Sequence, residues 1–167
     1  MSEVVLRKSN PADIERVVGI ERDSANTPFI RTWSVDRHLH AVNDIDHGHY
    51  VVTINGSEEI IGYAILIGLD DPEGNIEFKR LVIDAKGKGY GRAAFREVVK
   101  MAFEDLGAHR VHLDVMEHNQ RGFHIYSTEG FVQEGVQREA AVVDGRRVNL
   151  IMMSMLHREW HELAATK

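Results

Sequence analysis

The sequence predicts an α/β (α+β) fold, in which a mixed, mostly antiparallel sheet of about seven strands is flanked by helices. Apolar runs of strand length recur along the chain and are separated by Gly, Asn and Asp turns. Residues 75–129 alternate strand, helix, strand and helix, so two strands there should pair in parallel across a helical crossover. No linker, repeat or low-complexity segment interrupts the 167 residues. We therefore expect one domain over residues 1–167.

The N-terminal part should contain one strand and two helices. The strand Val4–Lys8 is followed by an Asn cap, a first-turn Pro and an acid at the third position (residues 10–13), which start a helix that continues to about residue 24. Ser34 should cap a second helix that runs through residue 42. The intervening loop, residues 26–33, is unusually apolar. It either packs against the core or covers a substrate cleft.

From residue 49 onward the apolar residues first follow the two-residue period of strands and form an antiparallel meander, with a turn at Asn55-Gly56. Helices then alternate with strands, and Asp144-Gly145 joins the final pair. The last dozen residues look peripheral. The expected strands are 49–54, 60–69, 75–83, 110–116, 131–138 and 146–155, and the expected helices are 89–106 and 119–129.

Composition limits the function classes. Lys and Arg number 20 against 26 Asp and Glu, so the net charge of −6 argues against a nucleic-acid partner and permits a cationic substrate. Cysteine is absent, which removes disulfides, thiolate metal sites and a cysteine nucleophile and suits a reducing compartment. The N-terminus lacks a signal-peptide pattern, and no stretch approaches about 18 apolar residues. We expect no membrane segment and a cytoplasmic location.

The most informative segment is the run KGKGYG at residues 86–91, which lies between a strand and a helix. Its glycines allow a ligand close to the backbone, and the helix N-terminus directs free N–H groups and a positive dipole end to the same place. A P-loop is excluded because Arg92-Ala93 follows, and a dinucleotide fingerprint is excluded by the glycine spacing. The run predicts an anion site, with pyrophosphate favoured, although the same glycines also fit an ordinary connection.

A second group of residues follows that run in a fixed order. It comprises Asn119-Gln120-Arg121, Tyr126, Gly130-Phe131, Glu134-Gly135 and Arg138-Glu139. Together the two groups resemble the GNAT superfamily of acetyl-CoA-dependent N-acetyltransferases over residues 51–156. Within it the sequence is most similar to the branch that contains ribosomal-protein alanine acetyltransferases and spermidine acetyltransferases. The resemblance implies a GNAT-like form of the predicted sheet and acetyl-CoA as cosubstrate.

Acetyl-CoA carries a pyrophosphate, an amide-bearing arm and a thioester, so its site needs an anion cradle, a strand edge with unpaired backbone groups and a proton donor near sulfur. The resemblance places the arm along a strand, at a gap between the family's fourth and fifth strands. Lys86 departs from the Arg or Gln of the family signature, which replaces a forked donor or an amide by a point charge. The implied cofactor-binding residues are Leu81, Val82, Ile83, Lys86, Lys88, Gly89, Tyr90, Gly91, Arg92 and Asn119.

Two residues are the catalytic candidates. Within the family motif Tyr126 would protonate the departing thiolate, whereas outside it a core aromatic would be the simpler interpretation. A backbone N–H near Val82 or Ile83 would stabilise the oxyanion. Glu77 would accept the proton of the attacking amine, and it equally fits a solvent-facing carboxylate. Asp114 and His112 are alternative bases, and the strand period places both on one face.

Ten histidines raise the question of a metal, but none accompanies an acid in a recognised catalytic pattern, so we expect no metal site. We expect the histidines on surface loops or facing the acceptor. Acidic residues near the expected mouth suit a polyamine or another cationic amine. They are Glu21, Asp23, Asp36, Asp44 and Asp46.

The acceptor has alternatives. A protein N-terminus is the second candidate, and Asn149 departs from the Asp common in that branch, which weakens transfer of either substrate. A non-catalytic acetyl-CoA-binding module is an alternative of another class. A homodimer is compatible with the long apolar stretch 150–156, through a sheet edge or the C-terminal strands.

Overall fold

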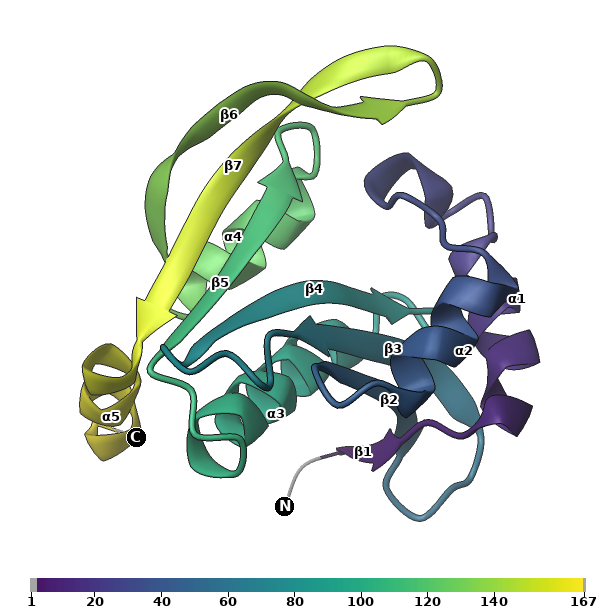
Figure 1. Cartoon of the computed structure of the whole chain (residues 1–167), viewed down its shortest axis with the longest axis horizontal. Helices are drawn as coiled ribbons and strands as arrows, with labels where there is room; N and C mark the ends of the chain where they lie inside the picture. The colour runs from purple at the N-terminus through teal and green to yellow at the C-terminus, as the bar shows by residue number, and fades with distance from the viewer. Residues whose placement is uncertain (1–2, 167) are drawn as a thin grey trace.

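The computed structural model describes residues 3–166 and contains one twisted seven-stranded sheet with helices on both faces (Figure 1). The strands are β1 Val4–Lys8, β2 His47–Ile54, β3 Ile60–Ile67, β4 Asn75–Ile83, β5 Arg110–Met116, β6 Val132–Val143 and β7 Arg146–Leu156. The α-helices are α1 Ile14–Glu21, α2 Val35–Asn43, α3 Tyr90–Glu104, α4 Gln120–Thr128 and α5 His157–Ala165, with 3₁₀ turns η1 Pro11–Asp13 and η2 Thr27–Phe29.

The strand order β1-β2-β3-β4-β5-β7-β6 confirms the predicted mixed sheet. Every adjacent pair is antiparallel except β4 and β5, which are parallel and are joined by the α3 crossover. The parallel ladder is short, since it pairs only Asn75–Glu77 with 110–112. Beyond it the two strands diverge, and Figure 1 shows the resulting V-shaped opening.

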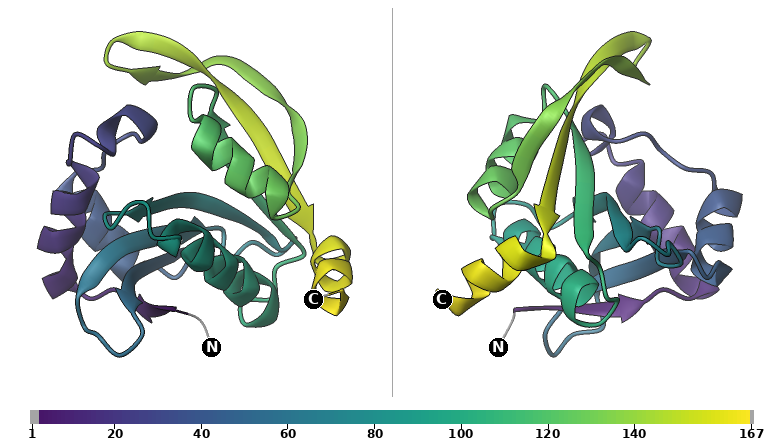
Figure 2. Two further views of the ribbon diagram at one scale, coloured as in Figure 1. Left: turned by 180° about the vertical axis from the view of Figure 1, so that it is seen from behind. Right: turned by 60° about the vertical axis from the view of Figure 1, so that its left-hand side comes forward.

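Two apolar layers hold helices against the sheet (Figure 2). On one face α3 packs through Phe95, Val98 and Ala102 against β3, β4, β5 and β7. On the other face α1 and α2 pack through Val17 and Ala41 against β2, β3 and β4. Burial of these side chains on both faces explains the nearly continuous apolar runs of the central strands.

Most expected boundaries agree with the structure within a few residues. The Asn10 side chain accepts from the Ala12 N–H at 3.0 Å and Ser34 accepts from the Arg37 N–H at 3.1 Å, so both predicted caps are present. The first helix ends earlier than expected, at Glu21, and β6 extends five residues further, to Val143. The segment treated as peripheral contains α5, whose Trp160 stacks on Phe103 of α3.

A buried polar chain links the α1/α2 layer to the sheet. Glu21 is fully buried, and its carboxylate accepts hydrogen bonds from His38 at 3.0 Å, Tyr63 at 2.7 Å and Arg80 at 2.9 Å. Its other oxygen accepts from the Trp33 N–H at 2.6 Å. Burial opposes ionisation of Glu21, but these donors lower its pKa overall. A buried carboxylate with four donors, one of which is an arginine, is satisfied.

The chain continues from His38 Nδ1 to His49 Nε2 at 3.0 Å and from His49 Nδ1 to Ser9 Oγ at 2.7 Å. Because a carboxylate only accepts, His38 donates to Glu21 through Nε2. If both rings are neutral, His49 Nε2 then donates to His38 Nδ1, and the Ser9 hydroxyl donates to His49 Nδ1. Burial, followed by the charge of His38, lowers the pKa of His49 to about 4. The folded protein therefore favours a neutral His49.

This depressed pKa predicts acid sensitivity. His49 is protonated near its ordinary pKa of 6.5 in the unfolded chain, but only at about pH 4 in the folded chain. The stability that neutral His49 contributes is therefore fully present above pH 6.5 and is lost as the pH falls toward about 4. The full loss amounts to about 3 kcal/mol. His49→Gln keeps a side chain that donates and accepts but removes the titration.

Urea unfolding at several pH values between about 4.5 and about 7 tests this effect. Midway in this range, we expect the unfolding free energy to change more steeply with pH in the wild type than in the variant, by about 1.1 kcal/mol per pH unit. Parallel pH profiles for the two proteins would contradict the assignment of this titration to His49.

Candidate active site

The divergence of β4 and β5 creates a gap along which β4 has no partner strand beyond Glu77. The register between β3 and β4 shifts at Lys79, which has no partner in β3, and this bulge bends β4 away from β5. Further along, the Asp84 N–H donates to the Ile61 carbonyl, so strand alternation directs the N–H and C=O groups of Leu81 and Ile83 into the gap. Val82 pairs with Tyr63 in β3.

The glycine run forms the turn that leads from this gap into α3. Gly87 and Gly89 have φ values of +76° and +79°, which favour glycine. A side chain built at 87, 89 or 91 would meet no heavy atom within 4 Å, so the space above the turn is open. The first helical bond runs from Ala93 to the Gly89 carbonyl, which leaves the N–H groups of residues 90–92 without helical partners. The turn therefore fits a pyrophosphate.

The side chains around this turn have defined partners. Lys86 donates from Nζ to the Ile83 carbonyl at 3.0 Å, and burial, followed by the charge of Arg121, lowers its pKa. The Arg92 guanidinium pairs with Glu129 at 2.5 Å, so only its main chain faces the turn freely. The Tyr90 ring packs against the apolar cluster beneath β4, although its N–H lies at the helix start.

Asn119 is the N-cap of α4. Its Oδ1 accepts from the Gly122 N–H at 3.0 Å, and a side chain at Gly122 would collide with the Asn119 amide nitrogen at 2.8 Å. The helix cap therefore uses Oδ1 of Asn119, and the Nδ2 amide group can donate to a ligand.

Tyr126 lies on the α4 side of the gap. Its ring packs against Phe95 with centroids 5.0 Å apart, and within residues 3–166 its hydroxyl has no hydrogen-bond partner. Burial, followed by the charge of Asp114, raises its pKa to about 12. Tyr126 is therefore a protonated phenol with a donor to offer.

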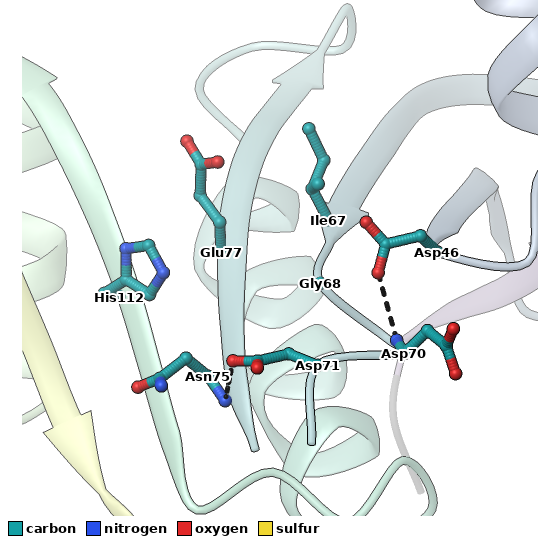
Figure 3. A pocket seen from close by; sticks show the side chains of 8 residues that line it. All are labelled: Asp46, Ile67, Gly68, Asp70, Asp71, Asn75, Glu77 and His112. Carbon is teal, nitrogen blue, oxygen red and sulfur yellow. Dashed lines mark hydrogen bonds between the residues drawn. The ribbon is translucent and has the colours of Figure 1, made fainter. Parts of the chain in front are cut away.

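Glu77 and His112 lie side by side in the last residue pair of the parallel ladder (Figure 3). Their side chains are on the face of the sheet opposite to the one that packs against α3 and Tyr126. Lys79 contacts Glu77 at 3.5 Å. Asp114 lies two residues beyond His112 on the same strand face. Burial, followed by the charge of Arg110, lowers the pKa of His112 and favours its neutral form. The three candidate bases thus share one face, as the strand period predicted.

A pocket of about 410 Å³ lies beside Glu77, between the start of β4 and the loops that precede β2 and β4. Asp46 and Asp71 line it and also accept backbone hydrogen bonds from Asp70 and Asn75 at 3.0 Å each (Figure 3). Glu77 and His112 form its inner edge. The pocket is rich in carboxylates and adjoins the candidate bases.

The structure corrects two expectations. Glu21 was expected near the substrate mouth, but it is fully buried and serves the polar chain described above. His38 and His49 were expected on surface loops or facing the acceptor, but both are core residues, with exposures of 0% and 1%. Asp23 and Asp36 are exposed, and Asp46 reaches the pocket.

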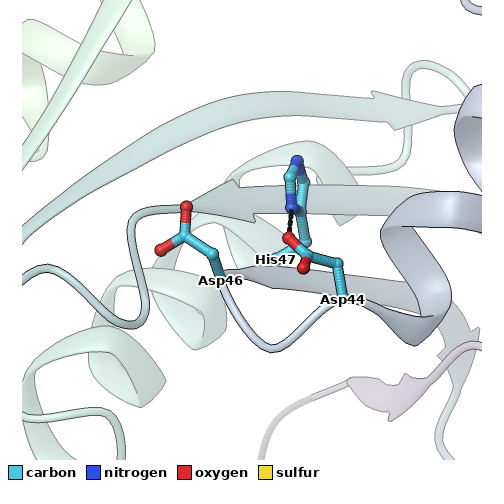
Figure 4. A group of neighbouring side chains, drawn as sticks. All are labelled: Asp44, Asp46 and His47. Atoms are coloured by element: carbon cyan, nitrogen blue, oxygen red, sulfur yellow. Dashed lines mark hydrogen bonds and ion pairs between the residues drawn. The ribbon is translucent and has the colours of Figure 1, made fainter.

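Within residues 3–166, one group of side chains has the spacing of metal ligands, and it consists of Asp44, Asp46 and His47 (Figure 4). His47 Nδ1 and Asp44 lie 2.5 Å apart as a hydrogen-bonded pair, and Asp46 is engaged by the Asp70 N–H. These contacts give each residue a role without an ion.

Asn149 has a role that sequence reasoning missed. Its Oδ1 accepts from the Glu139 N–H at 2.8 Å, and its Nδ2 donates to the Glu117 carboxylate at 3.0 Å. Glu139 has a φ of +51°, unusual for a residue with a side chain, and lies at a β6 bulge beside a hollow of about 630 Å³. An amide provides both the donor and the acceptor, whereas an ionised Asp would offer acceptors alone. The sequence signal for this role was that Asn149 replaces the Asp common in the related branch.

Comparison with known proteins gives a consistent result. The model of the acetyltransferase (GNAT) domain family matches residues 3–132. A spermidine N(1)-acetyltransferase of Vibrio cholerae is 26% identical over 75% of this chain and 70% of its own length. A ribosomal N-acetyltransferase-like protein of Bacillus subtilis is 35% identical over 45% of this chain and 41% of its own.

A solved structure shares the fold. The spermidine N-acetyltransferase of Vibrio cholerae, in complex with CoA and spermine, superimposes with a TM-score of 0.85 at 23% identity and covers 95% of this chain and 98% of its own. No helix within residues 3–166 is long and apolar enough to cross a membrane. By the family match over most of its length, the chain belongs to the GNAT acetyltransferase family and is an acetyl-CoA-dependent N-acetyltransferase.

Proposed function

We propose that the chain transfers acetyl directly to a primary amino group of a small cationic amine, with a polyamine favoured. The observation that carries this proposal is the carboxylate-lined pocket next to Glu77, on the sheet face opposite Tyr126. Carboxylates at that position attract an ammonium group and disfavour an anionic acceptor. The spermidine N(1)-acetyltransferase of Vibrio cholerae supports the same acceptor class.

Acetyl-CoA supplies an acyl thioester, which a neutral amine attacks. The open turn at 86–91 would hold its pyrophosphate through the N–H groups of residues 90–92, with Lys88 adding charge. Leu81 and Ile83 would bind the arm through backbone groups on the side of β4 that lacks a partner strand. Asn119 would add its amide donor.

We assign proton removal to Glu77. An ammonium ion in the pocket must lose a proton before its nitrogen can attack, and Glu77 is a carboxylate at the junction of the pocket and the gap. His112 lies beside it and favours the neutral form, so it is the second candidate, followed by Asp114. A backbone N–H of the gap, at Ile83, would face the developing oxyanion.

We assign proton donation to Tyr126. Its raised pKa keeps the hydroxyl protonated at neutral pH, and the hydroxyl has no competing partner in the part of the chain described. A phenol in that state can protonate a departing thiolate from Oη.

A protein N-terminus is the second candidate acceptor. The observation in its favour is the higher local identity, 35% over 75 residues, to the ribosomal N-acetyltransferase-like protein of Bacillus subtilis. The same gap and bases would serve an α-amino group.

A homodimer and a cytoplasmic location remain predictions. Most of the apolar stretch expected to mediate pairing, residues 150–156, lies within β7, between β5 and β6, so its apolar character follows from its place inside the sheet. A dimer formed through the C-terminal sheet edge would use β6, which is the outermost strand there and is largely exposed.

Removal of the Tyr126 hydroxyl tests the proton donor. Tyr126→Phe should lower kcat about a hundredfold and leave acetyl-CoA binding nearly unchanged, because the hydroxyl acts on the leaving group. Steady-state CoA release and calorimetric titration of acetyl-CoA measure the two quantities. Tyr50→Phe removes a hydroxyl elsewhere in the sheet and serves as the matched control. A drop in affinity without a drop in kcat would contradict the role.

Replacement of Glu77 tests the base. Glu77→Gln should lower kcat/KM about a hundredfold at neutral pH, and the deficit should shrink as pH rises toward about 10, because a growing fraction of the free primary amine is then already neutral. Glu73→Gln, at an exposed carboxylate near the start of β4, is the control. A pH-independent deficit would transfer the role to His112 or Asp114.

The acceptor is tested with a panel of spermidine, spermine, monoamines and Ala- or Ser-starting peptides. Released CoA is read with a thiol reagent, and the chain adds no background because it lacks cysteine. Asp46→Asn keeps an oxygen for the Asp70 N–H and removes one charge, so the KM of a polyamine should rise up to about fivefold while that of a monoamine stays constant.

Asp36→Asn, at an exposed position on α2 outside the pocket, controls for net charge. Turnover of peptides alone would move the assignment to protein N-terminal acetylation.

A further inference from the structure

Residues 26–33, which we call the strap, connect α1 to α2 and are firmly held at both ends. Asn26 is buried and donates from Nδ2 to the Ile20 carbonyl at 2.8 Å. At the other end the Trp33 N–H donates to Glu21, and the Arg80 guanidinium donates to the Arg31 carbonyl. The anchors at Trp33 and Arg31 connect to the buried polar chain, and Asn26 is itself buried, so both ends of the strap are tied to the core.

The tip of the strap has a different kind of contact. His118, in the loop that follows β5, meets the Pro28 carbonyl through Nε2 at 2.7 Å. A carbonyl only accepts, so Nε2 carries the hydrogen and donates whether or not the ring is charged. The Phe29 ring lies 5.7 Å from the His118 ring and is 42% exposed. The tip is thus fastened by one exposed hydrogen bond and one exposed ring contact.

The strap crosses the gap between the diverging strands. Arg80 belongs to β4, whereas His118 lies two residues beyond the end of β5. The strap touches these residues through Arg31 and Pro28, which are three positions apart and so can span at most about 10 Å. It lies on the α1/α2 face, the face that carries Glu77 and His112.

We propose that His118 is a positioning residue that closes the strap over the bound acceptor amine. The strong anchors fix the ends, and the weak tip contact can open and reclose at little cost, which allows the amine to enter. Since His118 precedes Asn119, the same loop holds a proposed cofactor contact and the latch. The inference rests on the proposed function, because it assumes that the amine reacts in this gap.

Kinetics of three variants test the latch. His118→Ala should raise the KM of the amine about three- to tenfold, with the KM of acetyl-CoA and the melting temperature close to wild type. His118→Gln restores an amide donor of similar reach and should recover most of the loss. His124→Ala removes an exposed histidine from α4, outside the latch, and should behave as wild type. Equal increases in both KM values, or no rescue by Gln, would overturn the proposal.

Hydrogen exchange of the free protein gives a readout that needs no turnover. In His118→Ala the amides of residues 27 and 29–31 should exchange at least several-fold faster than in wild type and His124→Ala, while the buried amide of Trp33 stays protected. Unchanged exchange at the tip would overturn the latch. If wild type turns over no amine, the proposed function fails separately, and the exchange experiment still decides whether His118 holds the strap.

Discussion

The early separation of β4 from β5 is the constraint on which the rest of the molecule depends. Backbone groups in a sheet interior are normally paired, yet the β4–β5 ladder stops after three residue pairs. The bulge at Lys79 produces the bend, and the α3 crossover brings the glycine turn to the end of β4. One departure from regular pairing therefore gives a polar strand edge, a helix N-terminus and two flanking sets of side chains in one place.

The buried chain around Glu21 keeps the other half of the site in position. A carboxylate, an arginine and two imidazoles in a protein interior are costly unless every hydrogen bond is made, and here each is made. The partners come from α1, α2, β2, β3 and β4, so the chain fixes the helical layer relative to the strand that carries Arg80. The proposed acceptor face is therefore held to the core by a fully hydrogen-bonded network.

Local signals in the sequence predicted much of this arrangement. The Asn10 and Ser34 caps, the glycine run and the strand alternation around His112 depend on neighbours a few residues away, and the structure has them as expected. The burial of Glu21 depends on Tyr63 and Arg80, which lie 42 and 59 positions away, and no local pattern encodes such a partnership. Glu21 therefore resembled a surface acid in the sequence.

The same limit applies to the C-terminal half. Asn149 departs from the residue common in related sequences, and its reason is a carboxylate 32 positions earlier, at Glu117. The place of β7 inside the sheet also follows from pairing with β5 rather than from its own composition. The cofactor residues implied by the family resemblance remain predictions, and they rest on three-dimensional information from related proteins that a single sequence lacks.

The three-pair ladder also has a mechanical consequence. Strands β1 to β4 form one wing of the sheet and β5 to β7 form the other, and the wings share few interstrand hydrogen bonds. A ligand that pairs with the free edge of β4 and also contacts α4 would take the place of a strand there and bridge the two wings. Cohesion of the sheet and occupancy of the gap are then thermodynamically linked, so saturation with cosubstrate should also raise the stability of the contact between the two wings.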